Sequence, residues 1–383
     1  MDFTFTEEQQ AATEAAKAVF SGVVPDGVPS PALVPGAVAE DIDRSLWAGL
    51  AAGDLLSLTL SPEHGGTGLD LIALCLVLRE SSRVLARVPL LETCAVAMVL
   101  QRYGDAGLAA ELLPRVGRGE LVLTVGANGR SGHDPAELAV TARRDSGDSD
   151  SGSVWVLDGV QSGVPWAQVA DWIAVPAHTA DGRAVLSLVR HSDEGVTLAE
   201  QVSTSGELLA EVRLDGVRVE DRALIDTADA WEWLRALLTT GTCALALGLG
   251  ETVLAMTSEY TGKREQFGFP VATFQSVAVQ AADRYIDLRA MELTLWQAAW
   301  RISTGTTGAL PAEGDIAVAK IWASDGVRRI VQTAQHLHGG FGADTDYPLH
   351  RFHAWAKQIE LSLGPAAAHE AALGDLLAAH PLG

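Results

Sequence analysis

The sequence predicts an α+β protein in three parts, with helices first, β-strands in the middle and long helices at the end. Three observations predict this order. Apolar residues recur at helical spacing up to about residue 118, short β-branched runs follow up to about residue 226, and long helical segments come after them. We therefore expect an N-terminal all-helical domain (1–118), a middle antiparallel β-barrel domain (119–226) and a C-terminal four-helix bundle (227–383).

The first domain is expected to contain helices separated by loops. Residues 6–20 are rich in Ala, Glu and Gln at helical spacing, and residues 21–36 then bring prolines and glycines that indicate a loop. Helical patterns return over residues 39–52, 69–84, 90–103 and 106–116.

The middle domain is expected to be an antiparallel sheet or barrel, because its apolar runs are short and rich in β-branched residues. These runs cover residues 121–125, 138–143, 154–157, 171–176, 184–189 and 210–219. The polar string DSGDSDSG at residues 145–152 indicates a solvated hairpin tip with no function of its own.

The last domain is expected to consist of long helices, which cover residues 228–261, 273–304, 313–338 and about 349–379. The most apolar stretch, residues 237–256, is interrupted by threonines and Glu251, which indicates a buried helix and no membrane span. Its small residues Gly241, Ala244 and Gly248 suit close helix approach, and we expect subunits to meet at these apolar helices.

Composition argues against several classes of function. The chain of 383 residues has 49 acidic and 27 basic residues, a net charge of −22 that disfavours nucleic acid. The three cysteines, Cys75, Cys94 and Cys243, are too far apart for a metal site or a disulfide framework. We expect reduced thiols, no bound metal and a cytoplasmic protein, because the N-terminus also lacks the basic region of a signal peptide.

Four strings of residues carry a resemblance to a known family. They are PEHGGTG (62–68), LDGVRVEDRALI (214–225), YTGKREQFGFP with FQ (260–270 and 274–275), and HGGFG with YPLHR (338–342 and 347–351). Each is weak alone, but in this order along the chain they resemble the acyl-CoA dehydrogenase family. The resemblance implies FAD as cofactor, an acyl-CoA thioester as substrate, and an electron-transfer flavoprotein or a similar acceptor as partner.

The last two strings also suit phosphate binding on physical grounds. Arg264 has a planar fork of donors that matches a pyrophosphate, although a surface salt bridge is the alternative for this residue alone. Gly339 and Gly340 allow backbone N–H groups to approach an anion closely. Phe267 is placed to lie against an adenine or ribose, and Gln275 lies about three helical turns beyond Arg264.

Members of the family are tetramers in which each FAD lies across a subunit boundary. One chain holds the flavin ring, and the other supplies the contacts to the pyrophosphate and adenosine. This sequence resembles the second kind, with His336 where the family usually has Gln; an imidazole can still donate to a phosphate oxygen. The cofactor-binding residues that the resemblance implies are Arg264, Phe267, Gln275, His336, Gly339 and Gly340.

The flavin-ring contacts of the family are missing from this sequence. The family string T-E-P-x-x-G-S-D aligns with ANGRSGHD (127–134), so Ala127 replaces the threonine that touches the flavin. The family string W-I-[ST]-N aligns with GVPW (163–166). Gly163 cannot stack on a ring, and Pro165 has neither a hydroxyl nor a backbone donor.

The catalytic base of the family is also missing. Removal of a proton beside a thioester needs a carboxylate within hydrogen-bond range. The two positions that carry this Glu in the family align with Leu363, sixteen residues after Tyr347, and with Leu238, twenty-six before Arg264. Glu360, nearly one turn before Leu363, is a candidate for a displaced base, but we expect no catalytic residue in this chain.

Three hypotheses fit this pattern. In the first, the chain is the non-catalytic subunit of an α2β2 acyl-CoA dehydrogenase, and a second acyl-CoA dehydrogenase subunit holds the flavin and the base. The strings VPLLET (88–93), HLHGG (336–340) and DTDYPLHR (344–351) resemble such enzymes of actinobacterial steroid side-chain degradation. In the second, a homotetramer binds its own FAD and uses Glu360. In the third, the fold persists in a non-enzymatic acyl-CoA-binding or scaffold protein.

Overall fold

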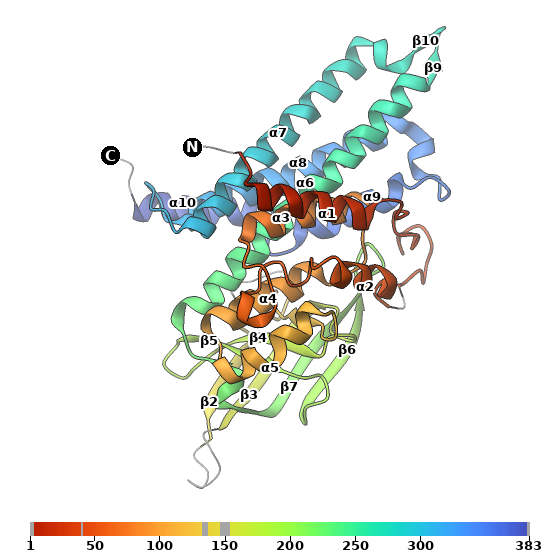
Figure 1. Cartoon of the computed structure of the whole chain (residues 1–383). Coiled ribbons are helices and arrows are strands. Elements are labelled where there is room, and N and C mark those ends of the chain that lie inside the picture. The colour runs from red at the N-terminus through yellow and green to blue at the C-terminus, as the bar shows by residue number, and fades with distance from the viewer. Residues whose placement is uncertain (1–3, 40, 132–136, 146–153, 381–383) are drawn as a thin grey trace.

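The computed structural model describes residues 4–39, 41–131, 137–145 and 154–380. The N-terminal helices lie between the β-sheet and the long C-terminal helices (Figure 1). The expected hairpin tip at residues 145–152 lies outside the described residues apart from Asp145, and so do residues 132–134 of the string ANGRSGHD.

The N-terminal helices begin where side-chain oxygens cap them. The oxygens of Thr6, Asp43, Asp70 and Asp105 each accept a hydrogen bond from the backbone N–H three residues on, which fixes the first turn of the helix. The elements are α1 Glu7–Phe20, α2 Arg44–Ala52, η1 Pro62–His64, α3 Leu71–Arg83, α4 Leu90–Tyr103 and α5 Ala106–Gly117.

The middle region forms one mostly antiparallel sheet, whose strands follow the order β6-β7-β3-β2-β4-β5-β8, with β1 beside β4. The pair β1–β4 is parallel, as is the single bridge between β2 and β4. The strands are β1 Leu123–Val125, β2 Val140–Arg144, β3 Val154–Pro165, β4 Trp172–His178, β5 Ala184–Val189, β6 Val196–Val202, β7 Leu208–Glu220 and β8 Leu224–Ile225, the last after η2 Asp221–Ala223. The sequence pattern missed β6 because this strand is polar and at the end of the strand order.

The C-terminal region is helical, but the closing helix is two helices, which corrects the expected single helix over 349–379. Leu363 and Gly364 have φ of 59° and 94°, and Pro365 begins the next helix, so the chain turns here. The elements are α6 Ala228–Lys263, β9 Glu265–Gln266, β10 Phe269–Pro270, η3 Val271–Thr273, α7 Gln275–Thr304, α8 Ala312–His338, η4 Gly339–Ala343, α9 Leu349–Leu361 and α10 Ala366–Ala379.

The central helix α6 packs against the N-terminal helices of the same chain. A Cβ on Gly248 would lie 1.9 Å from the backbone oxygen of Arg79 in α3, and one on Gly241 would lie 2.3 Å from Leu91 in α4. These two glycines therefore serve the packing of α6 against helices of the same chain. The apolar window of α6 is long enough to span a membrane, but 78% of it is buried inside the protein.

Candidate cofactor half-site and buried cavity

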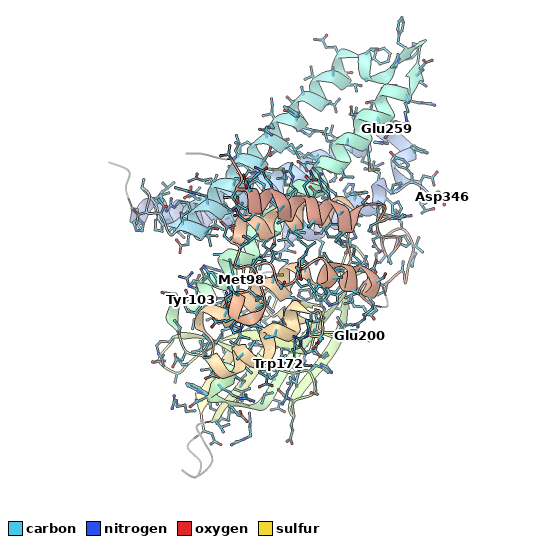
Figure 2. All side chains as sticks on the ribbon, viewed as in Figure 1. Met98, Tyr103, Trp172, Glu200, Glu259 and Asp346 are labelled. Atoms are coloured by element: carbon cyan, nitrogen blue, oxygen red, sulfur yellow. The ribbon has the colours of Figure 1, made fainter. Side chains whose placement is uncertain are left out.

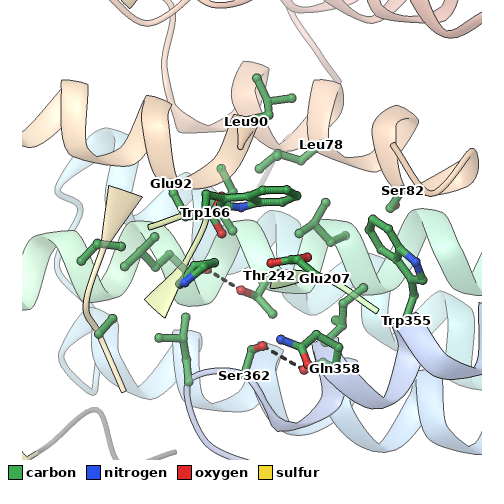
Figure 3. A pocket seen from close by; sticks show the side chains of 18 of the residues that line it. Leu78, Ser82, Leu90, Glu92, Trp166, Glu207, Thr242, Trp355, Gln358 and Ser362 are labelled. Atoms are coloured by element: carbon green, nitrogen blue, oxygen red, sulfur yellow. Dashed lines mark hydrogen bonds between the residues drawn. The ribbon is translucent and has the colours of Figure 1, made fainter. Parts of the chain in front are cut away.

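A cavity of about 130 Å³ lies where the sheet, the N-terminal helices and the C-terminal helices meet. Figure 3 shows Trp166 above it, Glu207 near its centre, and Trp355, Gln358 and Ser362 along one side. Its apolar wall comes from Leu78, Ala86, Val88, Leu90, Leu91, Val125, Leu245 and Ile359.

The residues that align with the flavin and base positions of the resemblance come together in this cavity. Ala127, Gly163 and Pro165 line it from the sheet, Leu238 lines it from α6, and Leu363 lines it from the turn after α9. Leu238 and Leu363 are 3% and 7% exposed, so both base positions hold buried aliphatic side chains. The cavity therefore offers neither a hydroxyl nor a carboxylate at these positions.

Trp166 has an unusual backbone conformation. Its φ is +60°, although bulky residues rarely adopt the left-handed region, and its indole is 8% exposed. The indole N–H donates to the carboxyl of Glu92 from α4, and the side chain closes the cavity from above in Figure 3. Strain of this kind persists where surrounding contacts hold it, which is common at functional sites.

Two carboxyl groups in the cavity were missed by the sequence analysis. Glu92 and Glu207 both line it, and Glu207 is only 7% exposed. Burial raises the pKa of Glu92 to about 7, and burial together with the nearby Glu92 raises the pKa of Glu207 to about 8. The sequence gives no signal for this, because Glu207 stands in a loop between two strands with no motif around it.

The displaced base that the sequence suggested lies elsewhere. The carboxylate of Glu360 is 2.7 Å from the ammonium of Lys357 and 3.8 Å from the guanidinium of Arg328. The backbone oxygen of Glu360 also accepts from Lys320, whose buried ammonium holds the end of α9. Glu360 is not among the residues that line the cavity, and its partners keep it in an ion-pair network.

The expected phosphate-binding residues lie on the surface at the free end of the C-terminal helices. Arg264 ends α6, and Phe267 and Gly268 form the turn of the β9–β10 hairpin with φ of 55° and 83°. Phe267 is 91% exposed, and its ring lies edge-to-face with that of Phe274, with ring centroids 6.4 Å apart. Gln275 is exposed at the first position of α7.

The second part of this surface, His336 with Gly339 and Gly340, is joined to the first by stacked rings. Tyr260, in the last turn of α6, stacks on His338 with ring centroids 4.3 Å apart, and on Phe341 at 5.5 Å. His336 is exposed near the end of α8, and both glycines are exposed at the start of η4. The six residues are thus carried by neighbouring elements of one surface.

This surface fits the phosphate end of FAD. A Cβ on Gly339 or Gly340 would meet no atom within 4 Å, so the backbone is open to an approaching anion. Within the described part of the chain, the guanidinium of Arg264 has no ion-pair or hydrogen-bond partner, whereas Lys263 beside it pairs with Glu259 at 2.5 Å. In Figure 2, Glu259 and Asp346 mark this end of the helices, well apart from Trp172 and Glu200 on the sheet. The Arg264 surface and the cavity are therefore on different parts of the molecule.

Comparisons with known proteins agree with this architecture. The family model "Acyl-CoA dehydrogenase, N-terminal domain" matches residues 6–120, and the model "Acyl-CoA dehydrogenase, C-terminal domain" matches residues 238–375, together more than half of the chain. The chain is 35% identical over 344 residues to "Acyl-CoA dehydrogenase FadE27" of Mycobacterium tuberculosis, covering 88% of this chain and 89% of that protein.

Two solved structures are similar over almost their whole length. A chain of the ChsE4–ChsE5 complex from Mycobacterium tuberculosis has a TM-score of 0.88 and 34% identity, covering 100% of both chains. A chain of a variant of the "Tcur3481-Tcur3483 steroid ACAD" has a TM-score of 0.87 and 35% identity, covering 97% of this chain and 98% of that one.

Proposed function

This chain belongs to the acyl-CoA dehydrogenase family, and we propose that it is the non-catalytic subunit of a hetero-oligomeric acyl-CoA dehydrogenase. The family's cofactor is FAD, which accepts a hydride from the acyl thioester during α,β-desaturation. In this proposal the chain supplies the contacts to the FAD pyrophosphate and adenosine, and a partner subunit holds the flavin ring and the catalytic carboxylate.

The observation that carries the proposal is the exposed, unpaired Arg264 beside the exposed ring of Phe267. A chain with a net charge of −22 leaves this guanidinium without an ion pair among the described residues, at a surface that contains open glycine backbone. An arginine fork suits a pyrophosphate, and an exposed aromatic ring suits an adenine. This half-site needs a second subunit to complete it.

The cavity supports a role without catalysis in this chain. Both positions for the family's base are leucines, and Glu360 is held in ion pairs away from the cavity. Glu92 and Glu207 do line it, but neither aligns with a position of the family's base, and the carboxyl of Glu92 already accepts a hydrogen bond from Trp166. Pro165 and Gly163 also lack the groups that would contact a flavin ring.

The similar proteins support a proposal for the partner subunit and for the class of substrate. One similar structure is a complex of two proteins, ChsE4 and ChsE5, and the other is described as a steroid acyl-CoA dehydrogenase. We therefore propose a second acyl-CoA dehydrogenase subunit as partner, in an α2β2 assembly, and an acyl-CoA thioester whose acyl group is the side chain of a steroid as substrate. An electron-transfer flavoprotein or a similar acceptor would reoxidise the cofactor.

Co-expression tests the proposal. The chain is produced alone and with the acyl-CoA dehydrogenase encoded beside it, and the oligomeric state, flavin absorbance and acyl-CoA oxidation of both preparations are measured. We expect flavin and activity only in the mixed complex, at one FAD for each pair of unlike subunits. One flavin per subunit in the isolated chain would support the homotetramer instead, and no flavin in either preparation would support a scaffold protein.

A further inference from the structure

The cavity beneath Trp166 is lined by acidic side chains that have no role in the proposed function. Its walls are mostly aliphatic, and the titratable side chains that line it are Glu92 and Glu207; no lysine, arginine or histidine lines it among the described residues. A positive charge, the guanidinium of Arg87, borders the adjoining smaller cavity beside Glu207, but it is ion-paired with Asp26, so an anion would meet two acids and a cation that is already paired. A carboxylate or phosphate ligand is therefore disfavoured, whereas a neutral ligand is not.

Several polar groups at this cavity lack hydrogen-bond partners within the described part of the chain, and the buried indole N–H of Trp355 is one of them. Two others are oxygen-bearing groups. The carboxyl of Glu207 has no hydrogen-bond partner, although the residue is 93% buried and its side chain points into the cavity in Figure 3. The buried Oδ1 of Asn128, which also lines the cavity, accepts no hydrogen bond. Buried polar groups in native proteins are nearly always paired, so both indicate a molecule that fills the cavity.

The volume of the cavity matches a small ring. Its volume of about 130 Å³ is close to the roughly 150 Å³ of an engineered apolar cavity that binds benzene. A tricyclic flavin ring is larger than this guest, whereas a single six-membered ring with one substituent is close to it. A smaller cavity of about 30 Å³ shares Trp166 and Glu207 as walls and has room for water beside the carboxyl.

We propose that this cavity is a binding site for a small neutral alicyclic group that carries one hydroxyl or carbonyl oxygen, which the carboxyl of Glu207 hydrogen-bonds. The apolar ring would lie against Leu78, Leu245 and Ile359, and the oxygen would face Glu207 and Asn128. At neutral pH the raised pKa of Glu207, about 8, keeps the carboxyl protonated, so that it donates its O–H to the ligand oxygen. This site is separate from the Arg264 surface and does not depend on the proposed role of that surface.

Cyclohexanol is the probe, and saturation-transfer NMR on the full-length chain measures its affinity. Methylcyclohexane has the same shape without the oxygen, and cyclohexanecarboxylate adds a negative charge. We expect cyclohexanol to bind with a Kd near or below about 1 mM, a range open to a ligand of about seven heavy atoms. The carboxylate should bind at least about tenfold more weakly, because burial of its charge among acids is unfavourable.

Protein variants distinguish the contribution of the hydrogen bond from Glu207 to ligand binding from the contribution of burying the apolar ring. Glu207→Leu should weaken cyclohexanol about tenfold and leave methylcyclohexane within about twofold, whereas Glu207→Gln, which keeps a neutral donor, should bind both like the wild type. Leu245→Trp should narrow the cavity and abolish binding of both rings. The matched control is Leu361→Trp, at an exposed position on α9 that does not line the cavity, and it should leave binding unchanged.

Each variant is used only if its circular dichroism spectrum matches that of the wild type and its thermal unfolding is cooperative, and Glu207→Gln provides the test if Glu207→Leu fails to fold. Absence of cyclohexanol binding at about 10 mM would overturn the proposal, and so would equal weakening of both rings by Glu207→Leu, or loss of cyclohexanol binding in Glu207→Gln. A change of FAD content in the mixed complex concerns the Arg264 surface alone. Failure of either proposal is therefore distinguishable from failure of the other.

Discussion

Leu238 on α6 and Leu363 after α9 line the same cavity, although they are far apart in the sequence. These are the two positions at which members of the family carry a catalytic Glu. Their meeting at one cavity agrees with both alignments. The chain therefore has an aliphatic side chain at both positions that align with the family's base.

Replacement of Glu360 tests whether a displaced base exists. We expect Glu360→Gln to leave the turnover number of the mixed complex within about twofold, because this carboxylate is paired with Lys357 and lies away from the cavity. Loss of a partly exposed ion pair should lower the free energy of unfolding by no more than about 1 kcal/mol. Steady-state acyl-CoA oxidation measures the first quantity, and a drop of about a hundredfold or more would make Glu360 the base.

Replacement of Arg264 tests the FAD half-site. We expect Arg264→Ala to weaken FAD binding by the mixed complex about 10- to 100-fold, the usual loss for a hydrogen bond to a charged group. The control is Lys263→Ala, which removes a neighbouring exposed cation that is already paired with Glu259. Flavin titration of the apo complex gives both affinities, and equal effects of the two variants would indicate general electrostatics in place of a specific contact.

Because α6 packs closely on α3, replacement of two glycines of α6 by alanine should change the free energy of unfolding by very different amounts. Gly248→Ala should lower the free energy of unfolding by about 3 kcal/mol or more, because its Cβ would lie 1.9 Å from the backbone oxygen of Arg79. Gly262→Ala, where a Cβ meets no atom within 4 Å, should be neutral or stabilising by up to about 1 kcal/mol. Thermal unfolding of both variants measures the difference, and similar midpoints would contradict the helix contact.

Glu207 predicts how stability depends on pH. Its pKa rises from 4.5 to about 8 on folding, so the folded chain holds a proton that the unfolded chain releases between these values. The free energy of unfolding should therefore fall as pH rises from about 4.5 to 8, by up to about 1.4 kcal/mol per pH unit, and this contribution should be absent above pH 8.

The variant Glu207→Gln cannot ionise, so it should gain stability over the wild type at about pH 8.5 and differ little from it near pH 4.5. The control Glu200→Gln changes an exposed carboxylate on β6 and should not alter the pH dependence. Thermal midpoints across this pH range measure both. A wild-type curve parallel to that of Glu207→Gln would show that Glu207 ionises normally in the folded chain.

The sequence by itself determined the order of helices and strands, and most of their bounds. Helix periodicity and capping are local properties, so α4 was expected over residues 90–103 and begins and ends there. Local sequence patterns failed to predict two elements whose conformation depends on the rest of the fold. These are the polar strand β6 and the break at Gly364 between α9 and α10. The sequence also determined that leucines occupy both positions of the family's base.

Only the tertiary structure decided which side chains surround the cavity and its carboxyl groups. The pKa of a carboxyl depends on desolvation and on charges that are distant in sequence, so nothing local marked Glu92 and Glu207 as buried neighbours. The same holds for Trp166, whose left-handed backbone is maintained by contacts from α4 and the sheet. Motifs record which groups a chain has, whereas folding decides which of them lose water and share a cavity.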